Sequence, residues 1–279
     1  METLWQDIRY GVRMLRKNPG FAFVAMVTLA LGIGANAAIF SIMDAVLLDP
    51  FPYKDQHQLQ QHRPKSGASG QILHGGPEYL AYREQQRSFI EVAAVETVSR
   101  NITVGGEEPE RLFGAKVSDN FFTMLGVNTV AGRILRPEEQ GPGKASLLVI
   151  GYGFWQRRFG GDPGVIGRKV ELDCEPFTIV GVMPARFLYR GTEFWFPFPF
   201  SLADPPRTQR WYQVLARLDS GVSLGDANAE LQTVAHRIER DHSASNREYA
   251  GWNVRSLPLA VLYFCLLVQN GDRLVIPEC

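Results

Sequence analysis

The sequence predicts an α+β protein in which a single N-terminal transmembrane helix is followed by a two-subdomain mixed α/β domain outside the cytoplasm. Two observations lead to this prediction. The stretch from Pro19 to Met43 contains no charged side chain. Beyond Asp49, patterns typical of strands and of helices are mixed without strict alternation, which favours α+β over a doubly wound sheet. The expected segments are a cytoplasmic amphipathic helix (1–18), the transmembrane helix (19–48), the outer domain (49–256) and an atypical tail (257–279).

The first segment has the pattern of a helix that lies on a membrane surface. Its apolar residues recur at helical spacing, and its polar side is basic; these residues are Leu4, Ile8, Val12 and Leu15 on one side, and Arg9, Arg13, Arg16 and Lys17 on the other. We expect this helix on the inner leaflet of the lipid bilayer, which is therefore the first predicted partner. One continuous helix kinked at Pro19 is the alternative.

The charge-free stretch is long enough to cross a bilayer. As a helix, Pro19 to Met43 would extend roughly 37 Å at ~1.5 Å per residue, and a hydrocarbon core is about 30 Å thick. Basic residues precede the stretch, while Asp44 and Asp49 follow it, so the N-terminus is expected in the cytoplasm and the domain outside. A cleaved signal peptide ending near Ala35–Ala37 is the alternative, although the apolar run continues past that site.

Helices and strands of the outer domain are predicted from local signals. Pro77 opens a helix that runs to Ser88, Gly126 and Gly160-Gly161 each end a short helix, and Ser223 with Asp226 caps a longer one. Apolar residues of this last helix, namely Ala227, Leu231, Val234 and Ile238, share one face. Strands are expected over 89–104, 145–150, 169–173, 177–183 and 211–218, with a hairpin turn at Gly105-Gly106 and a loop over 63–76.

Composition and motifs indicate no catalytic chemistry. Lys+Arg and Asp+Glu are 29 each, so the net charge is zero and a nucleic-acid partner is not expected. The three cysteines are far apart, and no metal, cofactor or catalytic motif is present, so we predict a chain that is not an enzyme and has no catalytic, cofactor-binding or metal site. His57 and His62 are expected on the surface, with His236 and His242 facing solvent.

Two patterns could be mistaken for sites. The run Gly141-Pro142-Gly143-Lys144 resembles a phosphate loop, but Glu138 stands where the first Gly should be, so we expect a solvated loop. The aromatic run Phe194–Phe198 could form a ligand patch, but core packing is the preferred interpretation.

Three stretches together resemble the N-terminal part of a MacB/FtsX-type ABC transporter permease, in the branch without a fused ATPase. They are Asp7–Arg13 with Lys17–Phe21, then Leu29–Phe40, and Val149–Pro184, which contains WQRRFGGDPGVIGRKVEL and FTIVGVMP. The resemblance implies a first helix in the inner membrane, followed by a periplasmic core domain (49–256). It also implies a homodimer, a separate cytoplasmic ABC ATPase, and relay of ATP-driven motion to the periplasmic side for export or efflux.

The chain departs from that family in two ways. Cys174 stands where the family has Gly in a hairpin turn, so a strained turn of altered type is expected. The likeness stops near Leu259, where the second membrane helix should begin, so we expect a truncated copy. A membrane-tethered periplasmic binding or interaction module that works without an ATPase is the alternative function. An anchored enzyme is the least favoured.

Overall fold

The computed structural model describes residues 17–43, 53–65, 73–139, 141, 143–144, 146–187, 189–198, 210–242 and 249–262. Contacts divide the chain into two compact units, Met1–Pro50 and Phe51–Cys279, and each is described by itself. The predicted amphipathic helix lies outside the described residues apart from Lys17 and Asn18. The predicted tail lies outside them beyond Leu262.

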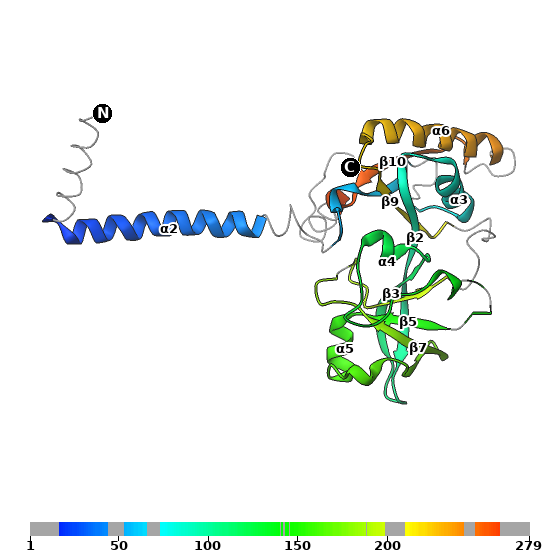
Figure 1. Cartoon of the computed structure of the whole chain (residues 1–279), viewed down its shortest axis with the longest axis horizontal. Helices are drawn as coiled ribbons and strands as arrows, with labels where there is room; N and C mark the ends of the chain where they lie inside the picture. The colour runs from blue at the N-terminus through cyan, green and yellow to red at the C-terminus, as the bar shows by residue number, and fades with distance from the viewer. Residues whose placement is uncertain are drawn as a thin grey trace. The chain divides into compact units, whose positions relative to one another are not determined.

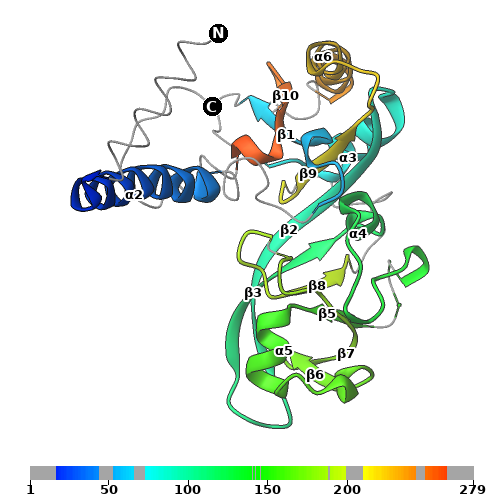
Figure 2. The same cartoon turned by 60° about the vertical axis from the view of Figure 1, so that its left-hand side comes forward.

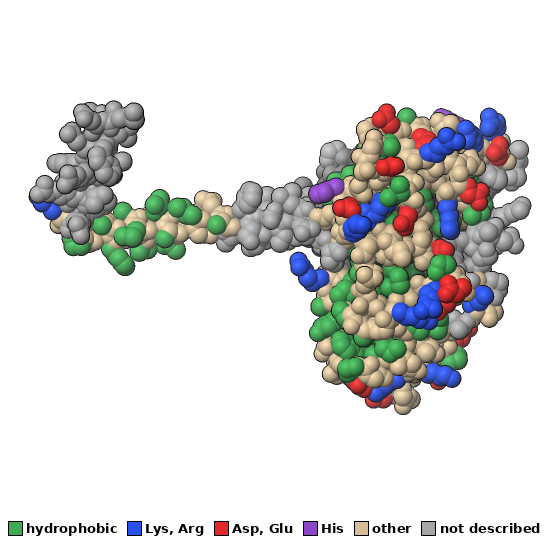
Figure 3. Space-filling view, in the orientation of Figure 1, with side chains coloured by type: hydrophobic (Ala, Val, Ile, Leu, Met, Phe, Trp, Pro, Cys, Tyr) green, Lys and Arg blue, Asp and Glu red, His purple; other side chains and the backbone are tan. Residues whose placement is uncertain are grey.

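The first unit contains helix α2 (Pro19–Met43), which is 25 residues long. Its large apolar side chains are exposed, as the green atoms along it in Figure 3 show; Phe21 and Leu31 have exposed fractions of 71% and 69%. Judged over the part of the chain that the structure describes, no helix combines the length and the hydropathy needed to cross a membrane.

The second unit mixes strands with helices on several faces (Figure 1). Its helices are α3 (Gly76–Gln85), α4 (Phe121–Leu125), α5 (Tyr152–Phe159) and α6 (Leu224–His242), with short 3₁₀ turns η2 (Gln56–Gln58), η3 (Pro137–Glu139) and η4 (Pro163–Val165). Its strands are β1 (Leu59–Lys65), β2 (Phe89–Thr103), β3 (Glu110–Val117), β4 (Ala131–Gly132), β5 (Leu147–Ile150), β6 (Lys169–Leu172), β7 (Glu175–Val182), β8 (Phe194–Pro197), β9 (Gln213–Leu218) and β10 (Asn253–Pro258).

The ten strands of the described residues belong to one sheet, nine of them in the order β10-β1-β9-β2-β3-β8-β5-β7-β4. Strand β6 pairs with both β7 and β2. The pairs β2/β3, β3/β8, β8/β5, β5/β7, β7/β6 and β6/β2 therefore close six strands into a ring. This strand ring forms the half of the unit that carries α5 in Figure 2. The other half of the unit is the open part of the sheet, β10-β1-β9-β2, together with the helices α3 and α6 that pack against it.

Strand β2 is 15 residues long and takes part in both halves. Val92 and Ala94 pack under α3 and α6, whereas Ala93 and Val95 pack with α4 on the opposite face. Further along, Ile102 enters the core of the strand ring with Leu148 and Phe154. Strand β2 thus contributes to three separate cores on one continuous sheet, and contacts group Phe51–Cys279 as a single unit. The division into two subdomains stays a prediction.

Local signals placed most of the helices and turns correctly. The Ser223 hydroxyl accepts a hydrogen bond from the Asp226 backbone N–H at 3.2 Å and donates to the Asp226 carboxylate at 2.6 Å, so α6 begins with the predicted cap. Gly126 and Gly160 both adopt left-handed backbone at the ends of α4 and α5. A helix end favours glycine there because other residues pay a steric cost at positive φ.

The turn at Asp173-Cys174 keeps a left-handed backbone despite its cysteine. Both residues have positive φ, 49° and 69°, as a type I′ hairpin requires. The altered turn type that we expected is therefore wrong. The reason is local bonding: the Asp173 carboxylate accepts from the Asn101 N–H and from Arg100, both at 2.9 Å, which ties the turn to β2.

Five of the described strands lie outside the predicted ranges, namely β1, β3, β4, β8 and β10, and one of them, β10, changes a domain boundary. The segment predicted as a loop from residue 63 begins inside β1, and the tail predicted from Leu257 begins inside β10. Leu257 pairs with Gln61 of β1, and Leu259 is buried, so these residues belong to the domain. The alternating pattern of a strand is not visible in β1, because β1 is polar and contains Pro64. Pro64 lies beyond the residues of β1 that pair with β9.

Candidate functional site

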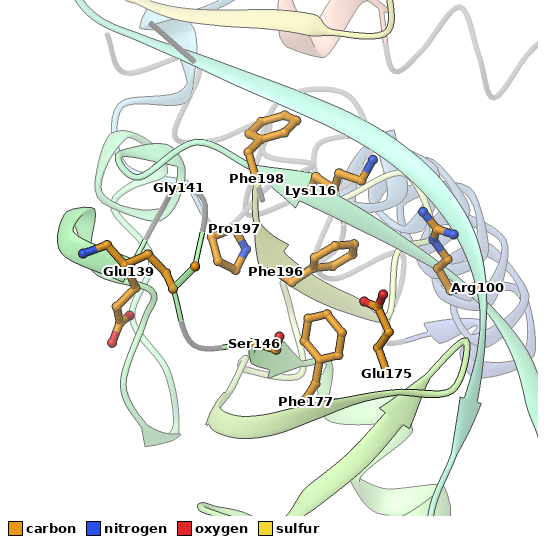
Figure 4. Close-up of a pocket in the computed structure, with 12 residues that line it drawn as sticks. Arg100, Lys116, Glu139, Gly141, Ser146, Glu175, Phe177, Phe196, Pro197 and Phe198 are labelled. Carbon is orange, nitrogen blue, oxygen red and sulfur yellow. The ribbon is translucent and has the colours of Figure 1, made fainter. Parts of the chain in front are cut away.

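A cavity of about 230 Å³ lies at one open end of the strand ring. It is called the ring cavity below. Figure 4 shows its lining, in which aromatic rings lie beside charged side chains. The lining residues are Arg100, Lys116, Glu139, Gly141, Gly143, Lys144, Ser146, Glu175, Phe177, Phe196, Pro197 and Phe198.

Strand alternation places Arg100 and Glu175 on the faces of their strands that line the ring core. Successive side chains on a strand point to opposite faces, so Arg100 lies on the same face of β2 as Ile102, whose side chain is buried in the ring core. On β7, Glu175 likewise shares the face of Phe177. The cavity exists because β5 begins only at Leu147, which leaves β8 and β7 without a strand between them at this end.

Lys116 lines the ring cavity and is held by an ion pair. Its ammonium lies 3.1 Å from both oxygens of Glu96, and the two side chains are only 11% and 12% exposed. The same ammonium lies 6.0 Å from the centre of the Trp211 ring. Its charge is therefore balanced within the protein and is not available as a free cation.

Glu139 is balanced in the same way. Arg133 binds it through two nitrogens, at 2.9 and 2.5 Å, and the Arg136 backbone N–H donates to it at 2.8 Å. These hydrogen bonds from Arg133 and Arg136 outweigh the effect of partial burial and hold the pKa of Glu139 below its usual value.

Arg100 and Glu175 differ from these pairs. Arg100 uses one guanidinium nitrogen to bind Asp173 at 2.9 Å, and its side chain remains 39% exposed. Within the described residues, no ion pair or hydrogen bond joins Glu175 to another side chain. Glu175 is exposed. In Figure 4 the side chains of Arg100 and Glu175 lie on the same side of the ring cavity, with the rings of Phe177 and Phe196 beside Glu175.

The two patterns that resembled sites in the sequence meet at this cavity. The Gly141 and Lys144 N–H groups bond to the carbonyls of Phe198 and Gly141, so these two groups do not point at a phosphate site. In the aromatic run, Phe194 and Trp195 are fully buried core residues, as predicted, while Phe196 and Phe198 also line the cavity. Core packing of this run is thus confirmed, and two of its rings also reach the ring cavity.

A second polar cluster lies in the core under α3 and α6. Glu78 and Arg210 form a 3.1 Å ion pair whose side chains are 0% and 6% exposed. The Arg210 guanidinium lies 4.7 Å from the ring centre of Tyr249 and 4.5 Å from that of Trp252. This pair joins three segments that are far apart in the chain, and it is a structural centre rather than an open site.

His62 was predicted on the surface, and this is wrong. It is 0% exposed and hydrogen bonds through Nδ1 to the Ser256 hydroxyl at 3.1 Å. His74, also buried, donates from Nε2 to the His62 carbonyl at 2.9 Å. Burial lowers the pKa of His62 to about 3 and that of His74 to about 4, so both rings are neutral at ordinary pH. His57 and His236 are exposed as expected, and the side chain of His242 lies outside the described set.

Outside the ring cavity, neither a cluster of metal ligands nor a cluster of like charges indicates a site in the described part of the chain. Among the described residues, no group of three or more His, Cys, Asp or Glu side chains could hold a metal ion. On the face of the second unit shown in Figure 3, basic and acidic side chains are interspersed.

Comparisons with solved structures support the fold. A domain of a protein described as a permease, from Porphyromonas gingivalis, has a TM-score of 0.57 at 15% identity, covering 74% of this chain and 93% of that one. The periplasmic region of MacB from Actinobacillus actinomycetemcomitans has a TM-score of 0.55 at 13% identity, with coverages of 75% and 92%. The extracellular domain of the ABC-type transporter YknZ from Gram-positive bacteria has a TM-score of 0.52 at 11% identity, with coverages of 71% and 99%.

Sequence comparison identifies the family. No protein with a curated description matches significantly. The model of the MacB-like periplasmic core domain matches residues 22–234, which is more than half of the 279 residues. This match and the shared fold agree with the resemblance found in the sequence, and the chain belongs to the MacB-like periplasmic core domain family.

Proposed function

We propose that this chain is a permease-type component of an ABC export system, anchored in the inner membrane with its N-terminus in the cytoplasm. The observation that carries the proposal is the family match over residues 22–234. The membrane crossing is supported by the sequence, because the 25 residues of Pro19–Met43 carry no charge and basic residues precede them. In this arrangement the domain of ten strands stands outside the cytoplasm.

The proposed mechanism is relay of motion rather than chemistry. A separate cytoplasmic ABC ATPase, expected from the family, closes on ATP and moves the membrane helix. The outer domain then changes position and acts on a substrate outside the membrane. A pair of these chains would couple two such domains, through their membrane helices, to one ATPase dimer.

Cys174 offers a direct test of the orientation, since it is exposed in the hairpin between β6 and β7. With Cys265 and Cys279 replaced by Ser, a membrane-impermeant maleimide should label Cys174 in intact cells. A matched variant with C174S and N18C should be labelled only after the inner membrane is permeabilised. Labelling of N18C in intact cells, with Cys174 protected, would contradict the proposed topology.

The ATPase partnership is tested separately. The full chain should co-purify in mild detergent with an ABC ATPase that mass spectrometry identifies, and light scattering should give the mass of a dimer. A purified chain that carries no ATPase and stays monomeric would favour the second candidate function, a membrane-tethered binding module. The ring cavity is the observation that favours this candidate.

A further inference from the structure

We propose that the ring cavity binds a small zwitterion with an apolar body, of the size of an amino acid or a dipeptide. Its carboxylate would bind Arg100, its ammonium would bind Glu175, and its apolar part would lie on Phe177 and Phe196. This inference goes beyond the proposed export function and does not depend on an ATPase partner.

The size of the cavity limits the ligand. Sites for drug-sized molecules usually measure about 300–1,000 Å³, and the ring cavity is smaller, at about 230 Å³. A macromolecule could insert only a single side chain or a chain end. A free molecule with one apolar group and one polar head fits this volume.

The aromatic lining favours an apolar body. The rings of Phe177 and Phe196 have centres 5.5 Å apart and meet edge to face at 76°. Both rings are largely buried in the ring core, at 8% and 6% exposed, so their positions are held by packing and do not need a ligand to order them. A preformed apolar surface of this kind binds ligands at low entropic cost.

The charges favour a zwitterion over a simple anion. Lys116 and Glu139 each face an opposite charge within the protein, so they add no net charge to the cavity. Lys144 stands on the exposed loop at the rim. Arg100 has guanidinium N–H groups beyond the nitrogen bound to Asp173, and Glu175 has no side-chain partner among the described residues. An anion alone would meet the Glu175 carboxylate, and a cation alone would meet Arg100, whereas a zwitterion satisfies both groups.

Three probes that share a phenyl group test this charge pattern. L-Phenylalanine carries both charges, 3-phenylpropionate only the carboxylate, and 2-phenylethylamine only the ammonium. In isothermal titration calorimetry of the full chain in mild detergent, L-phenylalanine should bind about tenfold or more tightly than either analogue, because each analogue loses one charge-assisted hydrogen bond.

Variants then assign the two contacts. E175Q should weaken L-phenylalanine binding about tenfold without weakening 3-phenylpropionate binding, which loses a repulsive neighbour. R100Q should weaken L-phenylalanine binding by a similar factor without weakening 2-phenylethylamine binding. E171Q and R111Q are matched controls, because both side chains are exposed and alternate with residues that face the ring core. They should bind L-phenylalanine as the unchanged chain does.

Three results with these probes and variants would overturn the proposal, and a fourth comes from S146L. The first three are no binding of L-phenylalanine up to its solubility limit, equal affinity for 3-phenylpropionate and L-phenylalanine, or unchanged L-phenylalanine affinity in E175Q. Circular dichroism and the midpoint of thermal unfolding establish that each variant is folded, and S146L supplies a second route because it would narrow the cavity without removing either charge. Loss of binding in folded S146L supports the site, and full retention contradicts it.

Discussion

The buried ion pair between Glu78 and Arg210 is the contact whose loss we expect to cost the most stability. The change E78Q removes the negative charge and keeps the shape of the side chain. Glu78 has 0% exposed side chain, so water cannot replace the missing carboxylate at the guanidinium 3.1 Å away. Arg210 keeps its aromatic neighbours Tyr249 and Trp252, which hold a positive charge without neutralising it.

The size of the effect follows from the geometry. Removing one partner of a buried ion pair costs about 3–5 kcal/mol of unfolding free energy. The remaining cation–π contacts lower this cost, since each contributes about 0.5–2 kcal/mol, so we expect E78Q to lose about 3 kcal/mol. Total stabilities are about 5–15 kcal/mol, and the loss should therefore be plainly measurable.

Urea unfolding of the full chain in mild detergent, followed by circular dichroism, measures this loss. The matched control is E138Q, because Glu138 pairs with Arg136 at 3.9 Å with both side chains more than half exposed. An exposed pair contributes about 0–1 kcal/mol. If E78Q shifted the unfolding free energy by no more than E138Q does, the reasoning about burial would be refuted.

Three further predictions concern the same unit. The free energy of unfolding should fall as pH drops below about 6.5, because the unfolded chain binds protons that the folded chain excludes from His62 and His74. His74 alone should account for a loss of about 3 kcal/mol at pH 4. Urea unfolding at several pH values measures this slope, and H74Q should reduce it. G114A should destabilise the domain by about 1–3 kcal/mol or more, since a Cβ at Gly114 would overlap the Phe194 ring; thermal unfolding measures the change. C174G should stabilise it by about 1 kcal/mol by relieving a side chain at φ 69°.

Each of these has a control. H236Q changes a histidine that is 71% exposed, and it should leave the pH dependence unchanged. G225A adds a methyl group to helix α6, where the nearest side-chain atom, the Ser223 hydroxyl oxygen, lies 3.6 Å away. It should therefore not destabilise the domain. C174A keeps a Cβ at positive φ and should not stabilise. A pH profile that H74Q leaves unaltered, or equal effects of G114A and G225A, would contradict the explanation offered here.

Features with a local cause could be read from the sequence. Ser223 and Asp226 lie within one helical turn, and the glycines at the ends of α4 and α5 need only their own backbone conformation. The charge-free stretch and the hairpin at Gly105-Gly106, where both glycines have positive φ, belong to the same class. In all these cases the residues that cause the structure are neighbours in the chain.

Features whose cause lies far away in the chain could not be predicted from the sequence. The burial of His62 depends on β10, and its hydrogen-bond partner Ser256 is 194 positions away. Strand β8 carries an aromatic run whose pattern could not choose between core and ligand patch. Its pairing with β3 and β5 decided the matter, because that pairing buries Phe194 and places Phe196 at the cavity.

The sequence by itself thus determined the charge-free helix, the capped helices, the tight turns and the family resemblance. Tertiary structure alone decided that β6 returns to β2 to close the strand ring, and that Arg100 and Glu175 line the same cavity. The physical reason is that strand periodicity tells which residues share a face, but only long-range pairing tells which strands face one another.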